Sequence, residues 1–324
     1  MSYRIFFSKA LLLIGMVFFG FSAFAQSWPT KPIRVVVPFA PGGGTDILAR
    51  VLAPRLSELL GQPIVIDNKP GASSIIGSQI VAQAPADGYT LLMVDSSILV
   101  NPGLRSNLPY DTLKAFTPIS HLAVGPVILV VNPSVPAQNL SELVKLAKAK
   151  PGELFYGSGG NGASTHLAGE LFKMAANINI GHAPFKGTGE AMAAVMGGQV
   201  PMTFTGISSA KQPVAAGRLR ALALTGERRH PAMPNVPTFA EAGLKGVDAS
   251  SHWGLLGPAN LPAAIVNQLS AAVNKALAES AIQVRVAGLG FDVKGGLPSD
   301  HLKLMEVEIE KWRKVIQTAG IKVN

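Results

Sequence analysis

The sequence predicts an α/β protein with two lobes, and three observations support this expectation. Segments of strand character alternate with segments of helix character along the 324 residues. Two strands, beginning at Ile33 and Leu154, each run into a glycine-rich loop that opens a helix. The two loops lie about 120 residues apart, roughly one domain length. We therefore expect one glycine-rich loop in each lobe.

Residues 1–25 have the character of an export signal. Arg4 and Lys9 form a short basic start, residues 11–21 are almost all apolar, and Ala23-Phe24-Ala25 fits the small-x-small cleavage rule. The apolar run of about 11 residues is shorter than the ~20 needed to cross a bilayer. An uncleaved anchor is the alternative. We expect cleavage after Ala25 and a soluble periplasmic protein, because no later segment is long and apolar enough to span a membrane.

Composition excludes several classes of function. The net charge is +9, but adjacent basic residues do not extend beyond Arg228-Arg229, and aromatic residues are few. A nucleic-acid surface normally interleaves basic and aromatic residues, so nucleic acid is not expected as a partner. The chain has no cysteine, which excludes disulfides, thiolate metal sites and cysteine nucleophiles.

The first part of the chain predicts three strands and two helices in alternation. The predicted strands are 33–37, 64–66 and 89–94, and the predicted helices are 46–60 and 73–84. Pro63 and the turn 85–88 separate these elements, and Asn68 to Ala72 form a further glycine-bearing turn. The order is typical of a sheet with helical crossovers.

The middle of the chain contains a segment that crosses between lobes. Residues 119–131 are largely apolar and β-branched, and Gly125-Pro126 interrupts them. Asn139 and Glu142 then form a capping-box pattern that opens a helix to about residue 149. We expect the chain to pass into its second lobe at Gly125-Pro126.

The remaining segments continue the same rhythm. The predicted helices end at about 176 and cover 188–196, 263–277 and 299–318, and the predicted strands are 178–184, 200–204, 219–224 and 251–256. A proline-rich connector at 231–237 precedes the last strand.

Both glycine-rich loops have the chemistry of an anion site. Glycine allows the backbone to approach a ligand closely, as at Gly42-Gly43-Gly44. The helix that follows presents unpaired N–H groups and the positive end of its dipole. The second loop, residues 157–166, adds hydroxyl and amide donors. Two such loops predict that one small anion is bound between the lobes.

Catalytic and cofactor motifs are absent or incomplete. The second loop contains G-x-G-x-x-G, but the strand that follows it ends at His182 without the acidic residue that would hold a ribose. Neither loop carries the Gly-Lys-Ser/Thr of a P-loop, Ser158 and Ser164 do not lie in G-x-S-x-G, and the six histidines form no metal-ligand pair. We expect no catalysis, no cofactor and no metal.

Several stretches in order resemble the Bug (TctC-like) family of extracytoplasmic solute receptors. The resemblance runs from about Trp28 to the C-terminus. The stretches that carry it are Trp28-Pro-Thr-Lys-Pro-Ile33, Pro38-Phe-Ala-Pro-Gly-Gly-Gly-Thr-Asp46, Asn68-Lys-Pro-Gly-Ala72, Ala86-Asp-Gly-Tyr-Thr-Leu-Leu92, Gly157 to Phe172, Pro184-Phe-Lys-Gly187 and Pro237-Thr-Phe-Ala-Glu-Ala-Gly243.

This resemblance implies a fold and a function. The fold is the two-lobed periplasmic binding protein type II fold, with a sheet flanked by helices in each lobe, which closes on its ligand like a flytrap. Residues 26–124 and 228–324 would form lobe I, and residues 125–227 lobe II. The protein would capture a small organic carboxylate for a tripartite tricarboxylate-type transporter, and we expect a monomer. The sequence departs from the family after Phe204, where Thr205 stands at a position at which relatives often have Asp.

The resemblance also implies that one carboxylate of the ligand lies between the loops at 39–46 and 158–166. The candidate ligand-binding residues are Phe39, Gly42, Gly43, Gly44, Thr45, Asp46, Ser97, Ser158, Asn161, Ser164, Thr165, His166, Phe185 and Lys186. Each has a structural alternative: the glycines as a tight turn, the phenylalanines as core, and Lys186 as a solvated side chain. Asp46 could be only a helix cap, and His166 could cap its own loop.

Two other functions stay open at this point. One is an exported enzyme that uses a bound nucleotide. The other is a receptor that reports its ligand to a membrane signalling partner such as a sensor kinase, in place of transport.

Overall fold

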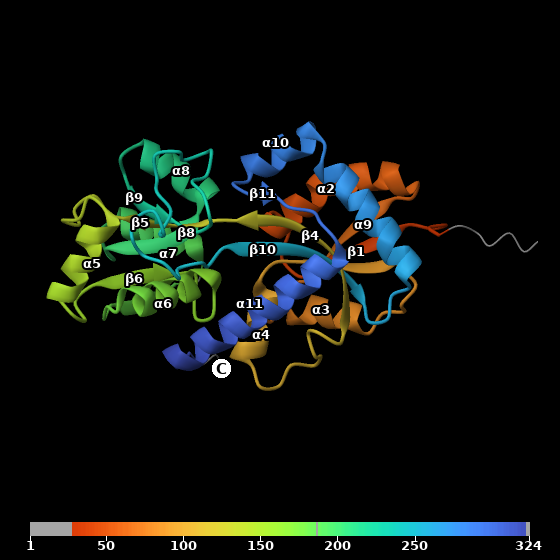
Figure 1. Cartoon of the computed structure of the whole chain (residues 1–324), viewed down its shortest axis with the longest axis horizontal. Helices are drawn as coiled ribbons and strands as arrows, with labels where there is room; N and C mark the ends of the chain where they lie inside the picture. The colour runs from red at the N-terminus through yellow and green to blue at the C-terminus, as the bar shows by residue number, and fades with distance from the viewer. Residues whose placement is uncertain (1–27, 186, 322–324) are drawn as a thin grey trace, which may run out of the picture.

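The chain forms two lobes in the computed structural model, which describes residues 28–185 and 187–321 (Figure 1). Each lobe is built on one β-sheet with helices on both faces. The expected export signal at 1–25 lies outside the described residues. Within the described part of the chain, no helix combines the length and apolarity that a membrane span requires.

The sheet of the first lobe has six strands in the order β11-β4-β10-β3-β1-β2. Their bounds are β1 Ile33–Val37, β2 Ile64–Asn68, β3 Thr90–Val94, β4 Phe116–Gly125, β10 Ser251–Pro258 and β11 Asp292–Val293. Strand β1 pairs in parallel with β2 and β3, whereas β10 runs antiparallel to β3 and β4. The sheet thus combines the first and last parts of the chain.

The sheet of the second lobe has five strands in the order β7-β6-β8-β5-β9. Their bounds are β5 Val127–Val131, β6 Phe155–Ser158, β7 Gly181–Pro184, β8 Met202–Gly206 and β9 Arg220–Leu224. Strand β6 is parallel to β7 and β8, and β5 is antiparallel to β8 and β9. All five strands come from one continuous part of the chain.

Ten helices among the described residues cover the two sheets. In the first lobe they are α2 Gly44–Leu60, α3 Ile75–Ala82, α4 Ser97–Leu104, α9 Ala263–Leu277, α10 Ser280–Gly288 and α11 Pro298–Ala319. In the second lobe they are α5 Leu140–Ala149, α6 Ser164–Ala176, α7 Thr188–Met196 and α8 Ile207–Ala215.

The alternation of side chains along the strands decides which helices cover which face. In β1, Val35 packs in a cluster with α2, α9 and α10, while its neighbour Val36 joins α3, α4 and α11 on the other face. In β5, Leu129 faces α5 and α6, while Ile128 faces α7 and α8. One apolar cluster is continuous between the lobes, because α11 packs on α4 and also contacts α6.

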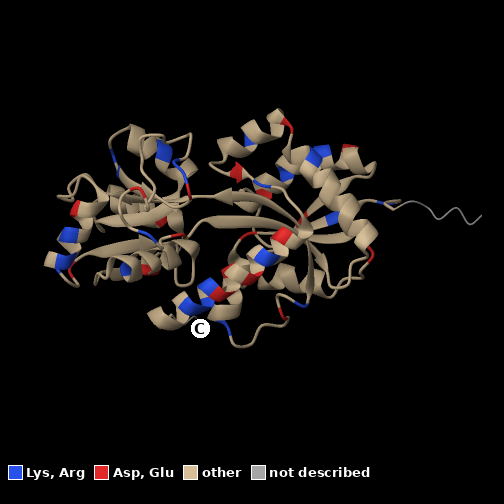
Figure 2. Ribbon diagram, in the orientation of Figure 1, with Lys and Arg blue, Asp and Glu red and all other residues tan. Residues whose placement is uncertain are grey.

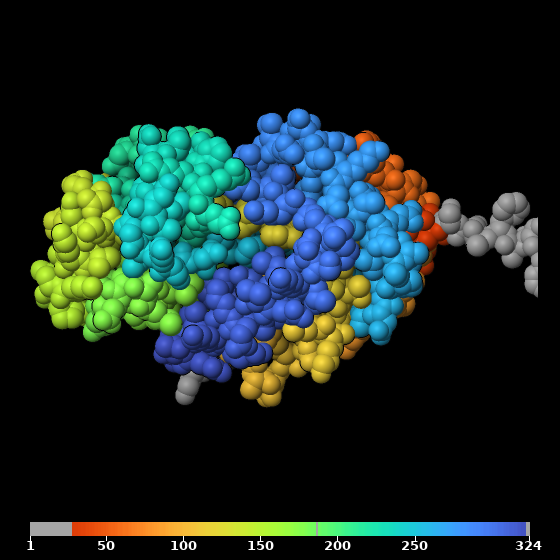
Figure 3. Space-filling view, viewed as in Figure 1, coloured from red at the N-terminus to blue at the C-terminus, as the bar shows by residue number. Residues whose placement is uncertain are grey.

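Two segments connect the lobes and are fastened to each other. Strand β4 ends at Gly125 and β5 begins at Val127, and the return segment leaves β9 at Leu224. The buried Thr225 links the two, because its Oγ1 accepts a hydrogen bond from the Val127 amide at 2.9 Å and contacts Ser250 Oγ at 2.9 Å. A hollow separates the lobes beside these segments in the space-filling view (Figure 3).

Most of the predicted elements are confirmed, and two helices were not predicted. The Asn139 cap of α5 forms as expected, since its side chain accepts a hydrogen bond from the Glu142 amide. Helix α4 escaped prediction because it is short, contains Pro102 and buries four consecutive residues, so it shows no helical periodicity. The short α10 was also missed.

Charged side chains are interspersed over both lobes (Figure 2). Along α11, lysines and arginines alternate with acidic residues and form pairs such as Lys311 with Glu308. No broad face of a single sign is visible in this view, which agrees with the expectation that nucleic acid is not a partner.

Candidate functional site

A cavity of about 320 Å³ lies between the two lobes. One wall comes from the first lobe and consists of Phe39, Ser73, Asp95, Ser96, Ser97, Val100, Asn101, Leu104, Arg105 and Ser251. The opposite wall comes from the second lobe and consists of Gly159, Asn161, Gly162, Ala163 and Ser164. The cavity is thus enclosed by the second glycine-rich loop, the start of α6, and one face of α4.

The two glycine-rich loops share one construction. Gly42 and Gly162 both have a positive φ, of 86° and 77°, and each stands two residues before its helix begins. The Gly42 amide donates to Asp46 Oδ2 at 2.9 Å, and the Gly162 amide donates to His166 Nδ1 at 3.0 Å. In both loops, therefore, the third residue of the helix reaches back and fixes the turn.

Asp46 is fully committed to holding its loop. Besides Gly42, it accepts hydrogen bonds from Arg50 Nε at 3.0 Å and from Asn68 Nδ2 at 2.9 Å. Burial would raise the pKa of the Asp46 carboxyl, but the hydrogen bonds from Arg50, Gly42 and Asn68 together hold it below its ordinary value. Of the two roles considered for Asp46, the contacts support the cap.

The threonine before each of these side chains is also used internally. Thr45 Oγ1 accepts a hydrogen bond from the Trp253 indole at 2.9 Å, and Thr165 Oγ1 accepts one from the Gly159 amide at 2.9 Å. Both threonines are buried. They bind the start of each helix to its own lobe, so neither hydroxyl points into the cavity.

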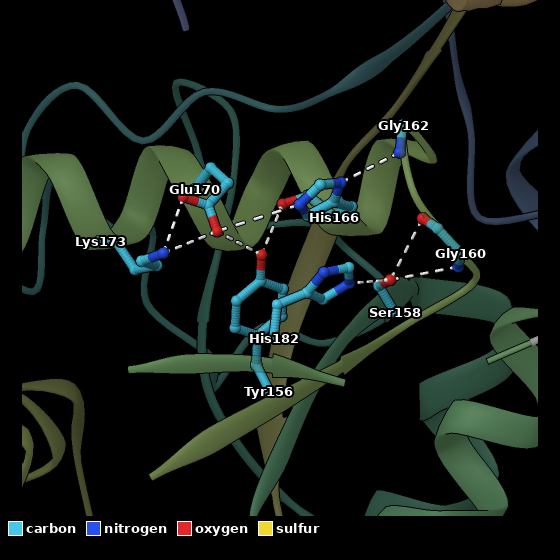
Figure 4. A network of polar contacts seen from close by, with 8 residues as sticks. All are labelled: Tyr156, Ser158, Gly160, Gly162, His166, Glu170, Lys173 and His182. Carbon is cyan, nitrogen blue, oxygen red and sulfur yellow. Dashed lines mark hydrogen bonds and ion pairs between the residues drawn. The ribbon is translucent and has the colours of Figure 1, made fainter. Parts of the chain in front are cut away.

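A buried polar network lies under the second loop (Figure 4). The rings of His166 and His182 are stacked with their centroids 3.9 Å apart, and His182 contacts the Ser158 hydroxyl. The Tyr156 hydroxyl donates to Glu170 Oε1 at 2.7 Å, and Lys173 pairs with the same carboxylate at 2.8 Å. The network rigidifies the loop from below, because every member has a partner.

His166 is held in its neutral form by this surrounding. Its Nδ1 accepts the Gly162 hydrogen bond, so the ring proton lies on Nε2, which faces Glu170 at 4.0 Å. Burial, together with repulsion from His182, lowers the pKa of His166 to about 4. His166 thus caps its loop, the second of the two roles considered for it.

The expected site residues divide into a cavity wall and a support. Phe39, Ser97, Asn161 and Ser164 line the cavity. The support, which does not line it, consists of Gly42, Gly43, Gly44, Thr45, Asp46, Ser158, Thr165, His166 and Phe185. A side chain on Gly44 would point toward the Phe291 ring at 3.2 Å, and Phe185 packs on the apolar cluster of the second lobe. Lys186 lies outside the described residues.

Three polar residues of the wall were not predicted, namely Asp95, Asn101 and Arg105. Asp95 follows β3, Asn101 lies within α4, and Arg105 follows that helix directly. The strand end before Asp95 was a usable signal, because ligands of open α/β sheets bind at the carboxyl ends of strands. Burial raises the pKa of the Asp95 carboxyl, whose Oδ1 accepts a hydrogen bond from the Ser97 amide.

A second histidine group lies behind the wall, between β4, β10 and α11. His252 Nδ1 lies 3.2 Å from His121 Nε2, and the His301 ring is stacked 6.0 Å from that of His121. Burial lowers the pKa of His121 and His301 to about 3 and that of His252 to about 4. Lys294, Lys311 and Asp248 also act on this group. The three rings are therefore neutral in the folded protein at neutral pH.

These buried histidines predict a loss of stability in mild acid. The unfolded chain binds protons on histidine at its ordinary pKa of about 6.5, whereas the folded protein does so only near 3 to 4. Stability is therefore greatest above pH 6.5 and falls as the pH drops toward 4, by up to about 1.4 kcal/mol per pH unit for each histidine. The raised pKa of Glu308 acts in the opposite direction, but it is one group against four.

Thermal unfolding between pH 4.5 and 8 at constant ionic strength measures this effect. We expect Tm to be flat from pH 8 to about 7 and to fall steadily below 6.5. A Tm that stays constant down to pH 5 would show that the histidines are not neutral and buried in the native state.

Comparisons with known proteins agree with this geometry. The sequence model of the family described as "Tripartite tricarboxylate transporter family receptor" matches residues 48–321. Protein BugT of Bordetella pertussis is 35% identical over 302 residues, which cover 93% of each chain. Periplasmic binding proteins are among the solved structures that the chain resembles.

Two of the similar structures contain an organic acid. The Rhodopseudomonas palustris protein Rpa4515 with adipate is 38% identical, with a TM-score of 0.79 over 91% of this chain and 99% of that one. MatC (Rpa3494) of the same organism with bound malate is 33% identical, with a TM-score of 0.75 over 89% of this chain and 100% of that one.

Proposed function

Because this chain belongs to the tripartite tricarboxylate transporter receptor family, we propose that it is an extracytoplasmic receptor that captures a small organic carboxylate between its lobes. The observation that carries the proposal is the cavity between the lobes, whose walls combine the start of α6 with polar side chains of both lobes. Adipate and malate in the two similar structures support a carboxylate as the ligand.

The start of α6 supplies the chemistry for binding one carboxylate. The N-cap residue Ala163 has no side chain that could satisfy the first amides of the helix. These N–H groups and the helix dipole attract an anion at that end. Asn161 and Ser164 are exposed toward the same cavity and can donate further hydrogen bonds.

The candidate residues take two kinds of role in this proposal. Phe39, Ser97, Asn161 and Ser164 contact the ligand directly. The remaining described candidates act by holding the two loops in shape, as the bonds from Gly42 to Asp46 and from Gly162 to His166 illustrate. Lys186 stays a candidate contact on the ground of the family resemblance.

Closure of the two lobes is the proposed mechanism of capture. We assign residues 26–124 and 228–324 to lobe I and residues 125–227 to lobe II. The crossings at Gly125-Pro126 and at Thr225 lie side by side, so small backbone rotations at these points would move one lobe relative to the other. Ligand would stabilise the closed state because only that state brings both walls into contact with it.

We propose that the acid is carried unchanged in the periplasm, after removal of residues 1–25, to the membrane subunits of a tripartite tricarboxylate-type transporter. The one serine–histidine contact among the described candidate residues, between Ser158 and His182, supports binding without catalysis. Ser158 is completely buried and also exchanges hydrogen bonds with Gly160, so no substrate could reach its hydroxyl.

A thermal-shift screen of the purified protein tests the proposed function. The panel contains dicarboxylates, tricarboxylates, acidic amino acids and aromatic acids, with nicotinamide and adenine nucleotides as controls. A ligand at about 100 times its Kd stabilises the native state by about 2.7 kcal/mol, which gives a measurable rise in Tm. We expect stabilisation by one class of acid and none by nucleotides. Stabilisation by nucleotides alone would exclude the receptor and favour the exported enzyme.

A further inference from the structure

Arg105 is the single cationic side chain on the described walls of the cavity between the lobes. It follows the last residue of α4 and belongs to the wall of the first lobe. The opposite wall carries the start of α6, which is the proposed site of one carboxylate. The cavity therefore contains two separate positive features.

Arg105 also lacks the partner that such a side chain normally has. Its Nε is buried without a hydrogen-bond partner, and no acidic group of the described residues lies within ion-pair distance of its guanidinium. The other half-buried arginines of the described chain all have partners: Arg34 pairs with Asp67, Arg55 with Glu279, and Arg220 donates to the Ala137 carbonyl. Burial of an uncompensated guanidinium is unfavourable, so an anion at this position would stabilise it.

The geometry of α4 separates this cation from the acid of the same wall. Asp95 lies just before the helix and Arg105 just after it, and the eight residues between Ser97 and Leu104 span about 12 Å. The side chains between them on the wall are uncharged. A negatively charged group of the ligand is thus repelled at the Asp95 end and attracted at the Arg105 end.

We propose that the ligand of this receptor carries two carboxylates, one bound at the start of α6 and the other paired with Arg105. This inference rests on the proposed function and adds the class of acid and the residue that selects it. A planar guanidinium binds a carboxylate through two parallel hydrogen bonds, so Arg105 can discriminate a second carboxylate from a methyl group of the same size.

Pairs of acids of equal chain length test the proposal directly. Isothermal titration calorimetry of the whole purified protein would compare succinate with butyrate, glutarate with pentanoate, and adipate with hexanoate. We expect one dicarboxylate to bind about 10- to 100-fold more tightly than its monocarboxylate partner. The variant Arg105→Gln should abolish this preference and change the affinity for the monocarboxylate less than about 3-fold.

Two further variants make the result specific. Arg218→Gln removes an exposed arginine far from the cavity wall and should keep the preference of the unchanged protein. Arg105→Lys keeps the charge but loses the paired donors, and it should give an intermediate preference. It also replaces Arg105→Gln if circular dichroism shows that the glutamine variant is unfolded.

The possible failures are distinguishable. If no carboxylic acid binds the unchanged protein, the proposed function is wrong. If monocarboxylates bind as tightly as dicarboxylates, the receptor function stands and the inference about a second carboxylate is wrong. If the preference persists in Arg105→Gln, the ligand has two carboxylates but Arg105 does not select it.

Discussion

Replacing Gly169 with alanine is expected to lower the free energy of unfolding by about 3 kcal/mol. Gly169 lies in α6, and an added Cβ would overlap the ring of Tyr156. That ring cannot move aside, because it is completely buried and its hydroxyl donates to Glu170 at 2.7 Å. Glu170 in turn is paired with Lys173. Relief of the overlap must therefore break this network or displace α6.

Urea unfolding followed by circular dichroism measures this change. The matched control is Gly189→Ala, because Gly189 also lies in a helix and an added Cβ there meets no atom within 4 Å. The control should be as stable as the unchanged protein or more stable by up to about 1 kcal/mol, since alanine favours helix. Equal unfolding midpoints for Gly169→Ala and its control would mean that Tyr156 is not held as described.

Replacing Asp46 with alanine is expected to cost about 3 kcal/mol of stability and to weaken ligand binding. The substitution leaves the Gly42 amide and the Asn68 side-chain amide without their acceptor in a part-buried position. Arg50 contributes less to the loss, because its side chain is 53% exposed and can turn to water. Without the bond to Asp46, Gly42 no longer has a partner that fixes its positive φ, so the loop at 39–46 becomes mobile.

Glu58→Ala provides the control for the loss of a carboxylate in the same helix. Glu58 pairs with Arg55, but its side chain is 67% exposed, so the substitution should cost less than about 1 kcal/mol and leave binding unchanged. Urea unfolding and calorimetric titration with the acid selected by the thermal-shift screen measure both effects. If Asp46→Ala and Glu58→Ala are equally stable, Asp46 does not hold the loop.

Elements with a clear local signal could be predicted from the sequence. The strand of residues 33–37, the capping box at Asn139 and Glu142, and the helix at 188–196 all appear in the structure at the expected places. Helix α4 could not, because Pro102 and an almost fully buried surface remove the periodicity on which such predictions depend. Its omission also concealed Asn101 and Arg105, although Arg105 is the strongest charge on the cavity wall.

The candidate site was predicted in outline, but the separation of its residues into wall and support was not. Asp46 and His166 occupy equivalent positions after their glycines, and the sequence leaves each with two possible roles. The hydrogen bonds from Gly42 and Gly162 assign both to the support of their loops. Phe185 was paired with Phe39 as a wall of the site, yet it packs on the core of its own lobe.

The sequence by itself determined the class of fold, the two loops and their capacity for an anion, because each depends on residues close together in the chain. Glycine spacing, a helix start and strand alternation are local properties. Only the tertiary structure decided which side chains face the cavity and which remain unpaired. That depends on contacts between distant segments, such as Thr45 with Trp253 and His166 with His182, and on the absence of a described partner for Arg105.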